Sequence, residues 1–525
     1  MRHYCWLFFI LCLSLALLVS AQDNIRITVT TTTGDGSPVR DLQKADFSVQ
    51  QAGKPRTIDN FVSPQTPMPV PQLEANEYTN APKESEAGAI FVVLDTITTR
   101  YIDERDMREA ILKFLGRAAQ AQRAVTLAIL DAKGLHVYHD YRTGSNVLLA
   151  ALIKAGLGGM KGGTPPPGVS DAEVSTEVAR LTAFSKGDLP NSTPQDQLLR
   201  YVVDAPLLMF EDVGHAAYGL PGRKALVWVT NATPFDVDGK TFQFMSLKEA
   251  NLGAAVNGAQ VTSTKDALTP DQVKKLRVLW RNSLLALTDG GVALYPVQTH
   301  GASSPPADPL TIGVMKPLAE ITGGKAFYGG TDPFPEILQI SNGNVAGYVL
   351  GFAGDSKPSP DFHRLETTLS RPGVNLSAPA GYFSPEGTPK SRAQEDISAA
   401  LQSPLTFTGL VFNVTVSGQS DAGAKKKVEM IIALPGDSGV LNEATRSVDL
   451  ALLAVAKDAK GTTVGKLNEN AGGQFPPEAV AQIKEMGFQL KRSLEVPVGD
   501  FTLHVAIHDN QTGRVGSLTI PLSVK

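Results

Sequence analysis

Three polar side chains stand where a metal ion could be bound. Asp95 begins the run DTITT directly after an apolar stretch, Thr164 lies in a GGT sequence, and Asn231 follows the apolar stretch ALVWVT. If these stretches are strands of one sheet, the loops that follow them meet at one rim. Oxygen ligands from separate loops are what a hard divalent cation requires. The sequence therefore predicts Mg²⁺ or Mn²⁺ as a candidate cofactor, and it indicates no other.

The same residues also have a purely structural interpretation. Asp95 and Thr99 could cap a following helix, because short polar side chains accept hydrogen bonds from the first free amides of a helix. Asn231 could make hydrogen bonds within a turn. The residue types alone do not separate these two interpretations.

Other residues of catalytic types do not form a known catalytic set. The sequence GDSG at 436–439 is typical of a serine-protease nucleophile, but it falls between two expected strands, where a turn belongs, and no matching histidine motif precedes it. His504 and His508 share one strand face by their even spacing, whereas His136 and His139 would point to opposite faces. The sequence has no HExxH, GxSxG or phosphate-loop motif. We expect no catalytic residues and no enzyme.

The middle of the chain alternates strand and helix signals. Apolar runs typical of buried strands alternate with segments whose apolar residues have helical spacing. The main expected strands cover 89–94, 125–130, 225–230 and 292–297, and helices are expected over 103–119, 146–154, 197–217 and 269–287. This alternation predicts a doubly wound, mostly parallel sheet over residues 88–385, its edge completed by extended segments within 347–383.

Short strands with turn residues between them flank this α/β region. Residues 23–63 predict a small N-terminal β-rich module, and the Pro-, Glu- and Asn-rich residues 64–87 predict a linker. Six alternating segments within 403–525 predict a C-terminal β-sandwich of the immunoglobulin-like type. The expected fold class is therefore multidomain α/β plus β.

Composition and the first residues bear on partners and location. The 525 residues are 42% hydrophobic and 19% charged, with a net charge of −4 and no block of basic residues, so we expect no nucleic-acid partner. Residues 1–21 carry Arg2 before an apolar run and end in Ser20-Ala21, which predicts a secretory signal peptide. No later run is long enough to span a membrane. We expect an exported protein, located in the periplasm, at the cell surface or outside the cell.

Several segments resemble the von Willebrand factor type A-related proteins typical of acidobacteria. The resemblance covers residues 23 to about 385, and it implies a von Willebrand factor A-like fold for residues 88–385. The segments that carry it are DFSVQQAGKPRTIDNF, LPGRKALVWVT, GGVALYPVQT, LAEITGGKAFYGG and RPGVNLSAPAGYF.

The resemblance also implies roles for the polar residues at the rim. Metal-binding members of the broader fold hold a cation with a D-x-S-x-S run, a threonine and a later aspartate, and a partner's carboxylate completes the site. Asp95 matches the first acid, Thr99 can replace the second serine, and Thr164 fits the threonine. Ile97 stands at the first serine and cannot ligate, and Asn231 replaces the later acid, so the implied site is degenerate.

These expectations combine into one function and one alternative. The first is an exported, non-catalytic protein-binding protein of the adhesion type, whose rim contacts an unknown protein ligand through an acidic side chain. The alternative is a metal-independent structural or assembly component of the bacterial cell envelope.

Overall fold

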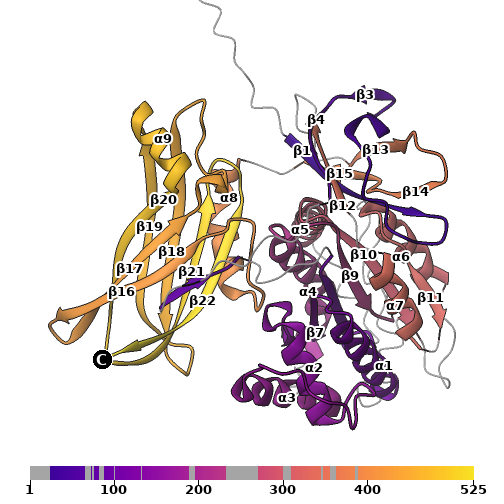
Figure 1. The fold of residues 1–525 in the computed structure, drawn as a ribbon, viewed down its shortest axis with the longest axis horizontal. Coiled ribbons are helices and arrows are strands. Elements are labelled where there is room, and N and C mark those ends of the chain that lie inside the picture. The colour runs from indigo at the N-terminus through magenta and orange to yellow at the C-terminus, as the bar shows by residue number, and fades with distance from the viewer. Residues whose placement is uncertain are drawn as a thin grey trace, which may run out of the picture.

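The structure, a computed structural model, has two lobes that lie side by side (Figure 1). It describes residues 24–64, 73, 76–81, 88–99, 101–131, 133–187, 195–231, 270–299, 309–330, 332–343, 347–354, 362–384 and 388–525. The expected signal peptide, residues 1–21, lies outside the described residues. One lobe contains helices and three sheets, and the other is formed mainly by the C-terminal strands.

A six-stranded sheet forms the centre of the first lobe. Its strand order is β11-β10-β9-β6-β7-β8. The strands from β11 to β7 pair in parallel, and β8 pairs antiparallel with β7 because the tight turn before Gly134 reverses the chain. The six strands are β6 (Ile90–Asp95), β7 (Val125–Asp131), β8 (Gly134–His139), β9 (Lys224–Val229), β10 (Val292–Thr299) and β11 (Phe327–Gly330).

Among the described residues, seven helices accompany this sheet, and they pack in two groups. α4, α5 and α6 contribute to one hydrophobic cluster with the sheet, and α1, α2, α3 and α7 contribute to another. α4 and α5 cross closely where Gly214 contacts Ala286 and Gly290. The helices are α1 (Tyr101–Gln120), α2 (Ser145–Ala155), α3 (Asp171–Lys186), α4 (Gln195–Ala217), α5 (Pro270–Asp289), α6 (Pro309–Ile321) and α7 (Phe334–Gly343).

The N-terminal strands do not form a module of their own. They pair with strands from residues 347–383 in two four-stranded antiparallel sheets, β14-β1-β12-β4 and β15-β13-β2-β3, around one shared core. The strands are β1 (Asn24–Thr33), β2 (Phe47–Gln51), β3 (Lys54–Arg56), β4 (Ile58–Val62), β12 (Gly347–Ala353), β13 (Phe362–Leu369), β14 (Val374–Ser377) and β15 (Gly381–Phe383). Residues 347–383 therefore complete these sheets and not the edge of the six-stranded sheet.

The second lobe consists of two four-stranded antiparallel sheets, β20-β17-β16-β5 and β19-β18-β21-β22, packed around a common core. The strands are β5 (Glu77–Thr79), β16 (Asn413–Ala422), β17 (Lys425–Leu434), β18 (Ser447–Lys457), β19 (Thr463–Gln474), β20 (Phe488–Val496), β21 (Gly499–Asp509) and β22 (Val515–Val524). Two helices accompany them, α8 (Pro389–Gln402) and α9 (Pro477–Met486). β5 comes from the segment expected to be a linker.

The predicted fold class is wrong. Four of the five sheets are antiparallel four-stranded sheets, and the six-stranded sheet is mixed, so a doubly wound parallel sheet flanked by separate β modules does not describe the molecule. The physical reason is that alternating apolar residues identify a strand but carry no information about its partner. β1, for example, pairs with β12 by placing Ile25 opposite Phe352.

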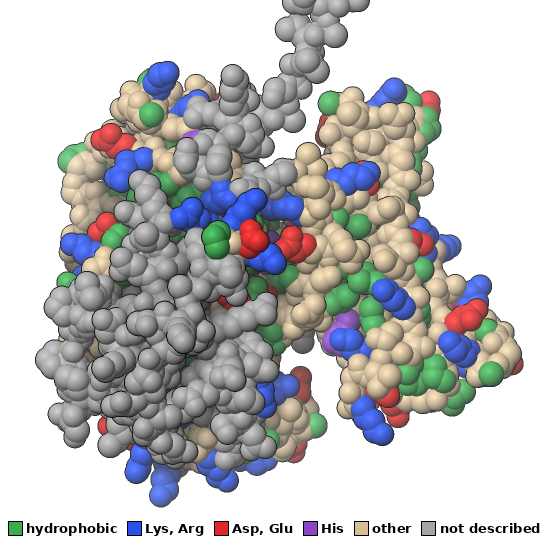
Figure 2. Space-filling model, turned by 180° about the vertical axis from the view of Figure 1, so that it is seen from behind, with side chains coloured by type: hydrophobic (Ala, Val, Ile, Leu, Met, Phe, Trp, Pro, Cys, Tyr) green, Lys and Arg blue, Asp and Glu red, His purple; other side chains and the backbone are tan. Residues whose placement is uncertain are grey.

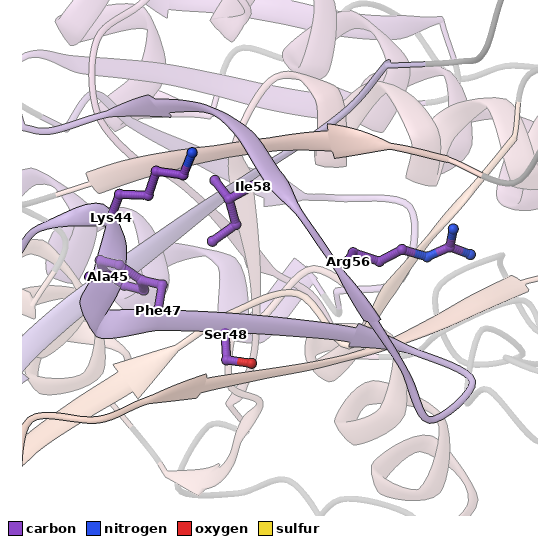
Figure 3. A pocket seen from close by; sticks show the side chains of 6 residues that line it. All are labelled: Lys44, Ala45, Phe47, Ser48, Arg56 and Ile58. Atoms are coloured by element: carbon purple, nitrogen blue, oxygen red, sulfur yellow. The ribbon is translucent and has the colours of Figure 1, made fainter.

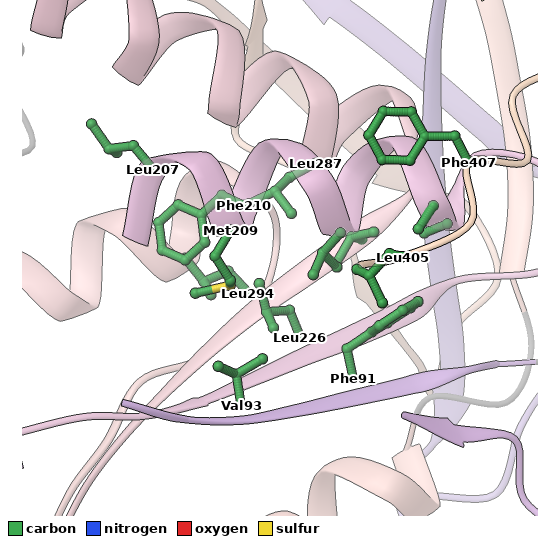
Figure 4. Close-up of a cluster of buried hydrophobic side chains, with 14 of the residues drawn as sticks. Phe91, Val93, Leu207, Met209, Phe210, Leu226, Leu287, Leu294, Leu405 and Phe407 are labelled. Atoms are coloured by element: carbon green, nitrogen blue, oxygen red, sulfur yellow. The ribbon is translucent and has the colours of Figure 1, made fainter. Parts of the chain in front are cut away.

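The two lobes share part of a hydrophobic core. Side chains from the segment after α8 and from the sandwich belong to the same cluster as those of β6, β9 and α4 (Figure 4). Phe407 is fully buried, and Arg142 reaches across from the first lobe to Thr406 and to the backbone of Thr79. The buried members contributed by the second lobe and its leading segment are Ile397, Ala400, Leu405, Phe407, Leu453, Val455, Ala506 and Val515. The lobes are therefore packed as one body.

Asn80 secures the strand that the linker contributes to the sandwich. This fully buried residue donates from Nδ2 to the carbonyls of Phe407 (3.0 Å) and Leu410 (2.9 Å), and its Oδ1 accepts from the amide of Phe412 (2.8 Å). We expect Asn80→Ala to lower the free energy of unfolding by about 3 kcal/mol, because three backbone groups lose their partner in a buried site.

Chemical denaturation of Asn80→Ala beside the exposed control Asn468→Ala measures this effect. Asn468 is an exposed residue of the sandwich strand β19. If Asn80→Ala lowers the free energy of unfolding no more than the control does, the three hydrogen bonds of Asn80 do not stabilise the fold as described.

Candidate functional site

Asp95, the central residue of the predicted metal site, ends β6 and is fully buried. Its Oδ1 accepts hydrogen bonds from the amides of Ile97 (2.9 Å) and Thr98 (3.2 Å). Its Oδ2 accepts from the hydroxyls of Thr98 (2.9 Å) and Thr230 (2.8 Å). Each carboxylate oxygen thus has two donors, all from neighbouring backbone or threonines.

Three oxygen atoms form a closed group at this point. The Thr98 and Thr230 hydroxyl oxygens lie 2.7 Å apart, and both contact Asp95 Oδ2. A threonine hydroxyl has one proton, so two hydroxyls cannot supply all three contacts. Burial raises the pKa of Asp95, although the four hydrogen bonds oppose the shift.

Two further oxygens of the predicted site are buried. Thr99 Oγ1 and Asn231 Oδ1 are inaccessible, and neither has a hydrogen-bond partner among the described residues. The amide of Asn231 donates to Thr98 Oγ1 at 3.3 Å, which holds the end of β9 against the loop after β6. The structure therefore brings Asp95 and Asn231 to one rim through Thr98.

Thr164 is placed differently. It is exposed on the loop between α2 and α3. The neighbouring Gly163 lies against Ile153, and Met160 approaches Gly116 and Gln120 in the second half of α1. Gly116 and Gln120 are about 20–30 Å along the helix from Tyr101, the residue that begins α1 after the Asp95 loop.

The residues present do not fit the expected magnesium or manganese site. Asp95 has no lone pair left toward an added cation, and Thr164 belongs to a loop that packs against the far half of α1. Within the described parts of the chain, no three His, Cys, Asp or Glu side chains form a group that could hold a metal ion. Thr99 and Asn231 alone offer one hydroxyl and one amide oxygen, a weak ligand set for a hard cation.

The other residues considered from sequence have structural partners. The GDSG segment forms a short 3-10 turn over Gly436–Ser438, as expected of a turn between strands. His136 pairs with Asp131, and His139 with Glu177 at 2.7 Å in a buried contact that ties α3 to β8. His508 is fully buried and pairs with Asp396 of α8, whereas His504 contacts Thr519.

The structure contains a cluster of ionisable side chains that sequence reasoning missed. Glu211 and His215 of α4 approach Asp396 of α8 where the two lobes meet, and Asp212 lies beside Glu211 and accepts a hydrogen bond from Ser403. Burial raises the pKa of Glu211 to about 8 and that of Asp212 to about 7, and it lowers the pKa of His215 to about 4. The signal in the sequence was the run EDVGH, which follows the apolar run APLLMF in the same helix.

A shallow pocket of about 360 Å³ lies beside the N-terminal strands (Figure 3). Lys44 and Arg56 supply its charges, and their head groups lie at opposite ends of the pocket. They therefore do not converge on a single ligand atom. The lining residues are Lys44, Ala45, Phe47, Ser48, Arg56 and Ile58.

Comparisons with known proteins add little to this description. No family model matches the chain, and no curated protein matches it. Two solved structures of a glycosyl hydrolase family 2 member from Bacteroides cellulosilyticus are similar to it at 11% and 10% identity, each with a TM-score of 0.16. Each match covers 34% of this chain, and the chain spans only 19% and 20% of the two structures. A likeness this weak carries no argument about fold or function.

None of the described helices combines the length and the apolar character that crossing a membrane demands.

Proposed function

We propose that the protein is an exported, non-catalytic protein-binding protein that acts without a metal ion. The observation that carries this proposal is the closed hydrogen-bonding of Asp95. A metal-dependent rim needs a carboxylate that faces an open position, whereas both oxygens of Asp95 accept from groups of the chain itself.

The polar rim then has a structural role. Asp95, Thr98 and Thr230 join the ends of β6 and β9 through side-chain hydrogen bonds, and the Asn231 amide adds a further contact. A rigid rim of this kind can present surrounding loops to a partner. Export rests on the signal peptide indicated by the sequence, and the absence of a catalytic motif in the sequence supports a binding role.

Calorimetric titration of Mg²⁺ and of Mn²⁺ into residues 22–525 tests the metal-independent role. We expect no saturable heat and no metal-dependent rise in the thermal midpoint, because a ligand bound only by the folded state must raise its stability. Asp95→Asn serves as the matched variant, since it keeps the shape of the side chain. Saturable binding that Asp95→Asn abolishes would overturn the proposal.

Hydrolysis assays on the same purified protein test the non-catalytic part of the proposal separately. We expect no turnover above that of the Asp95→Asn variant with glycoside, ester or peptide substrates. Turnover that purification to homogeneity does not remove would contradict it, whatever the metal titration shows.

A further inference from the structure

Where α4 meets α8 and the sandwich, Glu211 lies within electrostatic range of Asp212, Glu395 and Asp396 and of the guanidinium of Arg392. We call this set the α4–α8 junction, and it consists of Glu211, Asp212, His215, Arg392, Glu395, Asp396 and His508. Figure 1 places α8 on the edge of the sandwich that faces the first lobe. Figure 2 shows basic and acidic side chains gathered along the boundary between the lobes.

The junction is tied to both lobes by direct contacts. His215 stacks on Phe407 with ring centroids 5.1 Å apart, and its carbonyl accepts from the amide of Thr408. On the other side, Asp396 contacts His508 of β21 at 3.1 Å, and Asn510 bridges His508 to Asp449. A change of charge here therefore acts on the contact between the lobes.

The side chains are enclosed but not sealed from solvent. Glu211 and His215 are 20% and 26% exposed, Asp396 is 11% exposed and His508 is fully buried. Protons can reach the carboxyl groups, while water cannot fully solvate them once they ionise.

Charges on the other elements around α4 have partners of their own. Ser403 donates a hydrogen bond to Asp212. On β7 and β8, Asp131 pairs with His136 and His139 with Glu177, and on α5 Arg277 and Arg281 are engaged as well. Arg392 remains the fixed positive charge that acts on both Glu211 and His215.

We propose that the α4–α8 junction is a proton-controlled latch, which holds α8 and the sandwich against α4 when Glu211 and Asp212 are neutral and loosens when they ionise. Ionisation of Glu211 adds a negative charge beside Asp396 and Glu395, and ionisation of Asp212 adds another beside Glu211, while Arg392 supplies the positive charge that acts on Glu211. Like charges in a partly desolvated site repel strongly, so separating α8 from α4 lowers the electrostatic energy.

The pH range follows from the direction of each shift. The folded protein holds protons on Glu211 and Asp212 up to about pH 8 and about pH 7, whereas the unfolded chain loses them near the ordinary pKa values of 4.5 and 3.8. Stability from these groups is complete below those ordinary values and declines as pH rises through the folded values. His215, with a pKa lowered to about 4, is neutral across this range and does not offset the new charge.

Hydrogen–deuterium exchange at about pH 6 and about pH 9, corrected for the intrinsic chemical rate, tests the latch. We expect protection of residues 389–403 in the full chain to fall by on the order of tenfold between the two values. In the double variant Glu211→Gln with Asp212→Asn, which mimics the neutral carboxyls, we expect protection to stay constant. The exposed Glu485→Gln is the control and should behave as the unaltered protein.

Two results would overturn the latch. The first is an equal fall of hydrogen-exchange protection in the double variant, and the second is no fall of protection in the unaltered protein. If the double variant does not fold, the single variant Glu211→Gln should still show about half of the logarithmic fall, since one of the two charges is removed. The thermal midpoint provides a second readout. In the unaltered protein it should decline as pH rises from about 4 to about 8 and level off above that, and the double variant should lack this part of the decline.

Discussion

Gly214→Ala is expected to destabilise the protein by about 4 kcal/mol or more, a large effect for one added methyl group. Gly214 lies where α4 crosses α5, and a Cβ atom there would lie 2.3 Å from the Ala286 carbonyl carbon and 2.4 Å from its oxygen. Both atoms are backbone, so no side-chain rotation can make room. The helices would have to separate, which opens the buried cluster that they form with the sheet.

The same substitution at Gly313 of α6 gives the matched control. A Cβ at Gly313 meets nothing within 4 Å, so Gly313→Ala should be neutral or stabilise the helix by up to about 1 kcal/mol. Denaturant unfolding of both variants measures the difference. A small loss at Gly214, close to that at Gly313, would show that the crossing can relax and would contradict the close packing described above.

Arg223→Met is expected to lower the free energy of unfolding by about 3–5 kcal/mol. The guanidinium of Arg223 is buried at 1% exposure and donates to the carbonyls of Ser377 (2.7 Å), Thr322 (2.9 Å) and Gly323 (2.6 Å). It thus joins the end of α6 to β14. Methionine fills a similar volume but leaves these carbonyls without their donor in a site that water does not reach.

Two further variants separate this cause from a general effect of losing a charge. Arg223→Lys keeps the charge but cannot spread its donors over three carbonyls, so its midpoint should lie between those of the unaltered protein and Arg223→Met. Arg105→Met removes an exposed arginine of α1 and should change stability by less than about 0.5 kcal/mol. Equal losses for Arg105→Met and Arg223→Met would contradict the role of the buried hydrogen bonds.

The sequence predicted individual elements better than their arrangement. The strands expected over 89–94 and 225–230 correspond to β6 and β9, which are buried along their whole length as continuous apolar runs should be. Their pairing with other strands depends on contacts between distant residues. Nothing in residues 77–79 or 347–353 indicates that the first adds to the sandwich and the second to an N-terminal sheet.

In the candidate site, too, the sequence predicted the local position of residues better than their contacts. Residue type and position placed Asp95 and Asn231 at strand ends, where the structure has them. The hydrogen bonds that Thr98 and Thr230 donate to the Asp95 carboxylate depend on three-dimensional geometry, since Thr230 is 135 residues away from Asp95. Thr164 could not be placed, because the path of a loop rich in glycine and proline is not fixed by local residue preferences. The metal site stays a prediction.

The pairing of β1 with β12 has a consequence for the order in which the chain can fold during synthesis. Ile25 lies opposite Phe352, and β1 also pairs on its other side with β14, so both neighbours of this strand are made long after it. At about 5–20 residues per second, β12 leaves the ribosome roughly 15–65 s after β1. Throughout that time β1 has no strand paired with it, so the sheet that contains β1 closes only when residues up to 377 have emerged.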